Sequence, residues 1–187
     1  MTTLTHHRPD SDRELRLTAP VIDHPEAPAL IDRLAKWQRL FSPNAEPYRL
    51  AGYEDLYADA EGLLVYDNFA PGDSRFVGFD RYRKTWELSI NRDFPGFVME
   101  GIVVDRLHIA DDFATVAFTW TGDVQGEDGT SRVPAAQHAT HIWQKSVDGL
   151  WRITLEHLTG GVKINGRPYG EAVEARRPAA LDAAQSV

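Results

Sequence analysis

Three strand-like segments decide the fold: ATVAFTWTG (114–122), AAQHATHIWQK (135–145) and LWRITLEHLTG (150–160). In the first segment, Val116, Phe118 and Trp120 alternate with smaller or polar residues, which is the period-2 pattern of a strand with one buried face. Asp148 and Gly149 separate the second segment from the third, and an Asp-Gly pair between two strand patterns is a strong β-hairpin signal. We therefore expect an antiparallel meander.

The sequence before this meander contains helical patterns. Leu30, Leu34 and Trp37 recur at the spacing of one helix face, which predicts a first helix. We expect a second helix over residues 46–58 and a third over residues 78–91, each with aromatic residues on its inner side.

Two further strands are expected outside the meander. Residues 63–69 form a short apolar run, and residues 97–109 form a long one whose alternation slips, as a bulge or a sheet covered on both faces would explain. The element order predicts an α+β fold, in which a strongly bent, cone-shaped antiparallel sheet carries about three N-terminal helices on its concave face.

The ends of the chain differ from its centre. Residues 1–27 are polar and contain three prolines, so we expect a disordered or arm-like extension. Residues 28–165 are the expected cone domain, and residues 166–187 are an expected tail, frayed or disordered.

The composition limits the possible partners. The chain has 187 residues, of which 42% are hydrophobic, enough for one globular core. The net charge of −8 argues against nucleic-acid binding, because phosphate contacts need clustered Lys and Arg. We expect no membrane span and no secretory signal, because long apolar runs are missing. The absence of cysteine excludes disulfides and thiolate catalysis and is compatible with a cytoplasmic protein.

Several motifs share an order and spacing along the chain: YED (53–55), YD (66–67), VGFDRYRKTW (77–86), THIW (140–143), DGLWRI (148–153) and EHLT (156–159). Together they resemble the SnoaL-like, ketosteroid-isomerase-like branch of the nuclear transport factor 2-like superfamily. The SnoaL-3 type and the association domain of calcium/calmodulin-dependent kinase II look most similar. The resemblance covers roughly residues 30–162 and implies the same cone.

The resemblance also implies a range of functions, because this superfamily includes isomerases, polyketide cyclases, dehydratases, epoxide hydrolases and non-catalytic domains. Association domains line their pocket with arginines at the positions that correspond to Trp120, His141 and Leu158. This chain has none of them, so we do not expect carboxylate binding of that type.

His141 is the first candidate for general acid/base catalysis. His138 and His141 are three residues apart on one predicted strand, so their side chains point to opposite faces. The apolar set around Trp120 marks the inner face, and the resemblance places His141 on it. An imidazole with a pKa near 6.5 suits proton transfer at neutral pH. The alternative is a buried structural histidine, whereas His138 is expected on the outer face, at a subunit contact.

Asp67 and Glu156 are the candidate catalytic carboxylates. Asp67 ends a short strand near the cone mouth, where aromatic neighbours would raise its pKa and let it move a proton or activate water. The alternative is a turn-closing Asp. Strict alternation along the last strand would turn His157 inward, whereas the resemblance implies that Glu156 faces the cavity. We follow the resemblance and keep His157 as a possible ligand contact.

The candidate substrate-binding residues are aromatic or imidazole side chains: Tyr66, Tyr82, Trp86, Trp120, His138 and His157. The aromatic ones would form a wall for a flat or polycyclic ligand, and neighbouring tyrosines can donate to a developing enolate. The alternative is that they are ordinary core residues. We expect no metal ion and no organic cofactor, because the histidines are dispersed and no glycine-rich loop joins a strand to a helix.

Two hypotheses for function remain open at this point. The first is a cofactor-independent acid/base enzyme of the isomerase, cyclase, dehydratase or epoxide-opening type, acting on a hydrophobic small molecule. The second is a non-catalytic module for small-molecule binding or oligomerisation. We also expect a homodimer through the convex sheet face, to which Trp143 and Trp151 would contribute.

Overall fold

The computed structural model describes the ranges 16–19, 22–41, 48–59, 61–67, 75–93, 97–125, 130–159, 163–164 and 167–168. Most of the expected N-terminal arm and of the expected tail lies outside these residues. The helices are α1 (Ala27–Leu40) and α2 (Phe79–Asp93). The strands are β1 (Arg16–Thr18), β2 (Leu64–Asp67), β3 (Arg75–Val77), β4 (Val98–Ala110), β5 (Phe113–Gln125), β6 (Arg132–Lys145), β7 (Trp151–Thr159), β8 (Lys163–Ile164) and β9 (Arg167–Pro168).

Seven of these strands form one open sheet in the order β1-β4-β5-β6-β7-β2-β3. The expected meander is confirmed, because β4, β5, β6 and β7 are consecutive antiparallel neighbours. The expectation of a wholly antiparallel sheet is wrong at two places. Strand β1 pairs in parallel with β4, and β2 pairs in parallel with β7. The fold is thus mixed α+β.

The helix expected over residues 46–58 is wrong for the part that is described. Residues 48–59 form turns and one parallel bridge, between Tyr57 and Ile153. The Ile153 backbone donates to the Leu56 carbonyl and accepts from the Ala58 N–H, so this segment pairs with β7 instead of with itself. Gly52 has a φ of 78°, a left-handed conformation that interrupts a helix. Residues 42–47 lie outside the described ranges.

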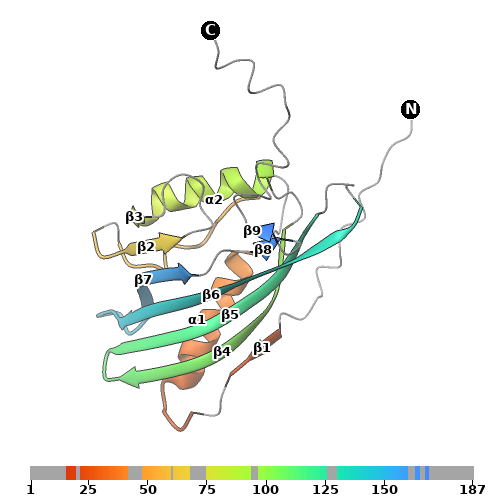
Figure 1. Ribbon diagram of the computed structural model, residues 1–187. Helices are drawn as coiled ribbons and strands as arrows, with labels where there is room; N and C mark the ends of the chain where they lie inside the picture. The colour runs from red at the N-terminus through yellow and green to blue at the C-terminus, as the bar shows by residue number, and fades with distance from the viewer. Residues whose placement is uncertain are drawn as a thin grey trace.

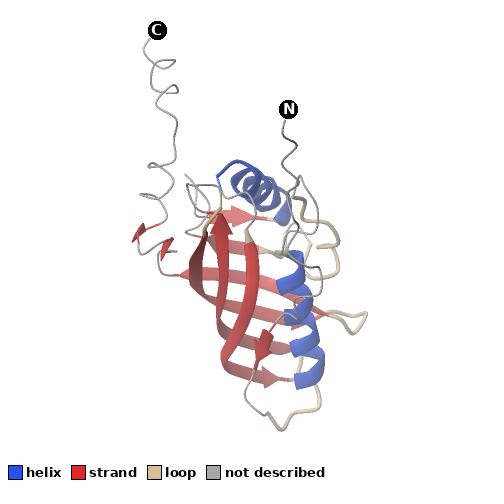
Figure 2. Cartoon of the chain, turned by 90° about the vertical axis from the view of Figure 1, so that its right-hand side faces the viewer, coloured by secondary structure: helices blue, strands red, loops and turns tan. Residues whose placement is uncertain are grey.

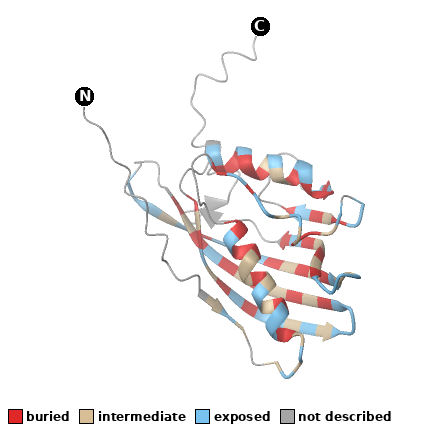
Figure 3. Ribbon diagram, turned by 180° about the vertical axis from the view of Figure 1, so that it is seen from behind, coloured by how far each residue is buried: buried red, intermediate tan, exposed pale blue. Residues whose placement is uncertain are grey.

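Helix α1 lies against one face of the curved sheet, and α2 lies beside β2 and β3 (Figures 1 and 2). The apolar stripe of α1, including Leu30, Leu34 and Trp37, is buried. Buried and exposed positions alternate along the long strands (Figure 3), as one covered face requires. Trp143 and Trp151 are buried within the chain, so they do not supply an exposed dimer surface. Neither described helix is long and apolar enough to cross a membrane.

Strand β4 contains the irregularity that its slipped alternation predicts. Its pairing with β5 shifts register between Met99 and Gly101 and again between Val104 and Arg106. At the first shift the backbones approach closely, because a Cβ on Gly122 would lie 2.2 Å from the Val98 carbonyl oxygen. Glycine is therefore required at this point of β5.

We predict that Gly122→Ala destabilises the protein by about 1–3 kcal/mol, the usual cost of overpacking. The added methyl group meets backbone atoms of β4, which cannot move aside as a flexible side chain can. Urea unfolding followed by far-UV circular dichroism measures the change. Thr121→Ser, on the exposed neighbouring residue, is the control and should stay within about 0.5 kcal/mol. Equal stability of the two variants would contradict the close approach.

Candidate active site

Strand pairing brings three predicted residues together on the inner face of the sheet. His141 on β6 pairs directly with Glu156 on β7. Glu156 in turn pairs with Val65 on β2, and Asp67 lies two residues further along β2, on the same face. His141, Glu156 and Asp67 each have 0% exposure. The structure therefore places all three of these side chains in the core.

Glu156 is the centre of a buried hydrogen-bond network. Its Oε2 accepts from the Tyr57 hydroxyl at 2.6 Å and from Trp37 Nε1 at 3.1 Å. Its Oε1 accepts from the Tyr82 hydroxyl at 2.8 Å. These donors come from α1, α2 and the segment 48–59, so three separate parts of the chain converge on one carboxyl group.

Tyr82 links the two carboxyl groups through a single hydroxyl. Its oxygen lies 3.0 Å from Asp67 Oδ2 and 2.8 Å from Glu156 Oε1, and Trp86 Nε1 donates to the same Asp67 oxygen at 2.8 Å. A phenol carries one hydrogen, so it can donate to only one carboxyl group at a time. The other contact is a hydrogen bond only when that carboxyl group is itself protonated. The geometry therefore fits a pair of carboxyl groups that holds one proton.

The pKa of Glu156 reflects this environment. Burial raises it from 4.5 to about 7, and the negative charge of Asp67 acts in the same direction. The hydrogen bonds from Tyr57, Tyr82 and Trp37 oppose the rise because they stabilise the carboxylate. Burial also raises the pKa values of Tyr57 and Tyr82 well above 10.0. Near neutral pH, Glu156 thus exchanges its proton while the phenols stay protonated.

His141 lies next to this carboxyl group as a neutral imidazole. Its Nε2 is 3.4 Å from Glu156 Oε2, and burial lowers its pKa to about 3. The ring is edge-on to Trp37 and Phe118, with centroid distances of 4.9 and 4.7 Å. Among the described residues, neither ring nitrogen has a hydrogen-bond partner. A neutral imidazole beside Glu156 adds no charge to this part of the core.

The other predicted ligand contacts are divided between the core and the outer face. Tyr82 and Trp86 belong to the network, whereas Trp120 is buried beside Phe97, with ring centroids 5.7 Å apart. Three residues lie on the outer face and are exposed: Tyr66, His138 and His157. The ring of His157 packs against Tyr66, and His138 Nδ1 lies 2.9 Å from the Thr119 hydroxyl.

Two network residues, Trp37 and Tyr57, were missing from the predicted site. Their helical spacing marked them as core, and both are indeed buried. The available signal was chemical, because a buried Trp N–H or Tyr O–H needs a polar partner. The sequence offers few buried carboxyl groups that can be that partner.

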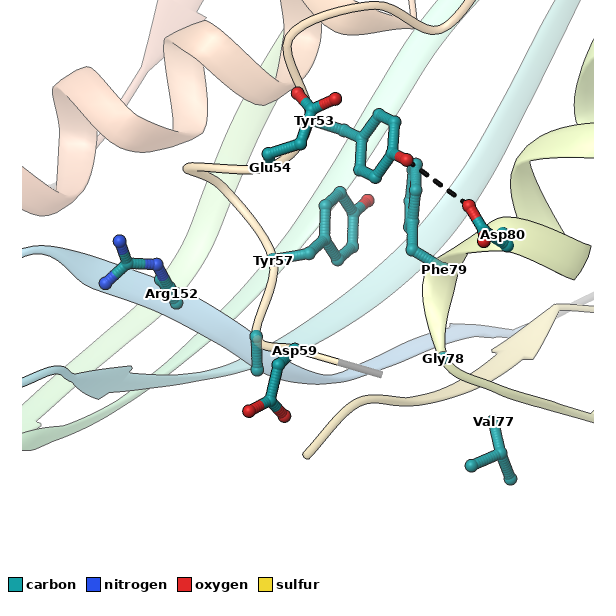
Figure 4. A pocket seen from close by; sticks show the side chains of 10 residues that line it. Tyr53, Glu54, Tyr57, Asp59, Val77, Gly78, Phe79, Asp80 and Arg152 are labelled. Atoms are coloured by element: carbon teal, nitrogen blue, oxygen red, sulfur yellow. Dashed lines mark hydrogen bonds between the residues drawn. The ribbon is translucent and has the colours of Figure 1, made fainter. Parts of the chain in front are cut away.

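A pocket of about 410 Å³ lies next to the network (Figure 4). Its lining residues are Tyr53, Glu54, Tyr57, Ala58, Asp59, Val77, Gly78, Phe79, Asp80 and Arg152. The Phe79 ring lies 4.3 Å from the Tyr53 ring and 4.2 Å from the Tyr57 ring, measured between centroids. Tyr57 thus belongs both to the pocket wall and to the network around Glu156. The described residues contain no group of three or more His, Asp or Glu side chains that could hold a metal ion.

Solved structures share this arrangement of elements. A nuclear transport factor 2-like superfamily protein from Salmonella enterica serovar Typhimurium LT2 matches with a TM-score of 0.54 and 14% identity, over 69% of this chain and 86% of that one. A protein from Xanthomonas campestris provisionally assigned as a calcium/calmodulin dependent protein kinase II association domain matches with a TM-score of 0.53 and 19% identity, over 78% and 94%. A ketosteroid isomerase-like protein from Erwinia carotovora atroseptica matches with a TM-score of 0.50 and 20% identity, over 70% and 89%.

These comparisons define the class of fold: the chain has the nuclear transport factor 2-like fold that its motifs resemble. No family model and no curated protein matches the sequence. At these identities the likeness concerns the fold alone, and this fold carries both catalytic and non-catalytic functions. The function must therefore be argued from the site.

We predict that the wild type loses stability as the pH rises towards 7 and above, and that Glu156→Gln does not show this loss. A raised pKa in the folded state means that the stabilisation is fully present below about pH 4.5 and is lost as the pH rises through about 7. The wild type should lose roughly 3 kcal/mol of unfolding free energy from this group across that interval. The glutamine variant should not, because it cannot ionise. Urea unfolding between pH 5 and pH 8 measures the difference between the two proteins.

Glu61→Gln, at an exposed turn, is the matched control for this measurement. His141 acts in the opposite direction, because its lowered pKa costs stability as the pH falls from 6.5 towards 3. Subtracting the variant curve from the wild-type curve removes this shared contribution. Parallel curves for wild type and Glu156→Gln would show that Glu156 does not bind its proton more tightly in the folded state.

Proposed function

We propose that this protein is a cofactor-independent acid/base enzyme acting on a hydrophobic small molecule, of the isomerase, cyclase, dehydratase or epoxide-opening type, with a place in secondary metabolism. The observation that carries this proposal is the pair of buried carboxyl groups joined by the Tyr82 hydroxyl. A carboxyl group with a pKa of about 7 is suited to give and take protons at neutral pH. Glu156 and Asp67, sharing one proton, would provide both an acid and a base.

Each network residue has a role in this proposal. Glu156 gives and takes the proton. Asp67 is the second carboxyl group of the pair and is joined to Glu156 through the Tyr82 hydroxyl. His141 stays neutral beside Glu156, so it places no charge next to the carboxyl group. Trp86 fixes the Asp67 carboxyl group by donating to Oδ2. Because every donor comes from a packed aromatic side chain, the orientation of both carboxyl groups is set before a substrate binds.

Access to Glu156 runs through Tyr57 in this proposal. The carboxyl groups are fully buried, and Tyr57 is the network residue that also lines the described pocket. Its hydroxyl donates to Glu156 at 2.6 Å. A molecule in the pocket lies against the ring of Tyr57, and displacement of that ring brings the molecule to the carboxyl group.

The alternative function is a non-catalytic module for small-molecule binding or oligomerisation. The observation that favours it is the complete burial of Asp67, His141 and Glu156, which a structural network would also show. One of the solved structures with this fold is provisionally assigned as an association domain. The two functions differ in one measurable property, because only an enzyme moves protons to or from a bound molecule.

We predict that the wild type catalyses deuterium uptake from D₂O into at least one member of a panel of hydrophobic ketones, detected by mass spectrometry. Asp67→Asn and Glu156→Gln should each lower the rate by about 10²–10⁴-fold, the usual contribution of a positioned acid or base. His141→Ala should lower it as well, because the neighbour of Glu156 is lost. The activity should rise with pH around 7, as Glu156 ionises to become the base.

Glu61→Gln serves again as the control and should keep the wild-type rate. Uptake that survives both carboxyl substitutions would remove the acid/base assignment. Binding of panel members without any exchange, in wild type and variants alike, would favour the non-catalytic module.

We also propose that the protein forms a homodimer through the outer face of the sheet. Strands β4 to β7 present small or apolar side chains there: Val103, Ala117, Thr119, Ala136, Thr140, Ile142 and Leu155. Val103 is 49% exposed and pairs with Thr119, which contacts His138. A face of small and apolar side chains suits a second copy of the same chain.

Sedimentation at micromolar concentration tests the dimer. We expect a species of twice the 21.0 kDa chain mass for the wild type and a shift to the monomer for Val103→Glu. The added carboxylate would be buried in the interface without a partner, which is unfavourable. Leu88→Glu, on an exposed position of α2, is the control and should remain dimeric. A wild type that sediments only at the monomer mass would reject this interface.

A further inference from the structure

The residues that line the pocket beside Tyr57 limit the chemical class of ligand that it can bind. Its volume of about 410 Å³ lies within the usual range of small-molecule sites. Tyr53, Tyr57 and Phe79 form a contiguous aromatic wall, with ring centroids 4.2 to 4.3 Å apart. Tyr57 and Phe79 are only 2% and 5% exposed, so the half-buried Tyr53 ring and the exposed Val77 side chain supply most of the apolar contact area for a ligand. This surface does not by itself select for charge.

The charged groups around this wall do select for charge. Three carboxylates line the pocket, from Glu54, Asp59 and Asp80, against the single guanidinium of Arg152. Arg152 donates to both oxygens of Asp148, at 2.9 and 2.7 Å, so its charge is already matched. Asp80 also has a cationic partner, because Arg83 Nη2 lies 3.9 Å from its Oδ1. Glu54 and Asp59 therefore supply the excess negative charge of the lining.

The lining carboxylates keep oxygen atoms that a ligand can reach. Asp59 uses Oδ1 to accept from the Gly62 N–H at 3.0 Å, and Asp80 uses Oδ1 to accept from the Tyr53 hydroxyl at 3.3 Å. Glu54, Asp59 and Asp80 are all exposed. The N-terminal end of α2 would favour an anion, but Asp80 in its first turn already offsets that field.

We propose that this pocket binds an organic cation, namely a small molecule with an apolar body and a protonated or quaternary amine. The apolar body lies on the accessible apolar lining. The carboxylates of Glu54, Asp59 and Asp80 point to different sides of the pocket in Figure 4, and together they supply the negative potential that favours the ammonium group. The site discriminates against carboxylate ligands by the same charges. The claim that the bound cation is also the substrate rests on the proposed function, whereas the binding itself does not.

The test uses benzyltrimethylammonium and phenylacetate as probes of similar size and opposite charge. Their binding to the full chain is followed by titration calorimetry and by the amide NMR shifts of Gly78 and Arg152. We expect the cation to bind at least about tenfold more tightly than the anion at low salt. The difference should shrink at high salt, because the carboxylates are exposed and screened.

The double variant Glu54→Gln/Asp59→Asn should weaken cation binding by about tenfold, since it removes two of the three carboxylates. Asparagine keeps the oxygen that accepts from Gly62, so the local turn is retained. Glu100→Gln/Asp105→Asn, at two exposed positions of β4, which is separated from β7 by β5 and β6, is the charge-matched control and should bind like the wild type. Equal affinity for both probes, or an equal effect of control and double variant, would overturn the proposal.

Glu156→Gln separates this inference from the proposed function. It should leave benzyltrimethylammonium binding unchanged, because Glu156 is behind the Tyr57 ring and does not line the pocket. Cation binding without exchange chemistry on any amino ketone would support the cation site and contradict the proposed enzymatic function. Exchange on neutral ketones that requires Glu156, together with no cation binding, would support the enzymatic function and contradict the cation site.

Discussion

The structure depends on satisfying two carboxyl groups inside an aromatic core. An ionised carboxyl group buried without partners is strongly unfavourable, so the chain must supply donors or keep a proton in place. Here it does both. Tyr57, Tyr82 and Trp37 donate to Glu156, Trp86 donates to Asp67, and the Tyr82 hydroxyl has one hydrogen for two acceptors. Because these donors come from α1, α2 and the segment 48–59, the network fixes how those elements pack on β2 and β7.

Much of this arrangement follows from sequence patterns, and the failures have physical causes. The alternation of Val116, Phe118 and Trp120 identified the inner face of β5, and pairing then placed His141 on that face. The same reasoning fails for residues 48–59, where the apolar spacing predicts a helix that does not form. That backbone instead bonds to Ile153 on a strand almost a hundred residues away, which no local pattern encodes.

The site was predictable only in part for the same reason. Asp67 and Glu156 stand out as carboxyl groups among apolar neighbours, but their contact through Tyr82 depends on the parallel pairing of β2 with β7. Strict alternation favours His157 over Glu156, because every second residue after Trp151 would face the same side of an unbroken strand. The register shift between Ile142 and Trp143 breaks that count, so Trp151 and Glu156 are both buried and His157 is exposed.

Tyr57 separates the proton-handling groups from the pocket, and this separation has a consequence for both proposals. A carboxyl group in contact with water would lose the burial that raises its pKa, and with it the proton affinity that suits neutral pH. A sealed carboxyl group cannot reach a ligand. One aromatic ring meets both demands, since it keeps water from Glu156 while its hydroxyl donates to that group at 2.6 Å. The exposed carboxylates of the pocket can then attract a ligand without altering the buried pair, because solvent screens them and the Tyr57 ring lies between.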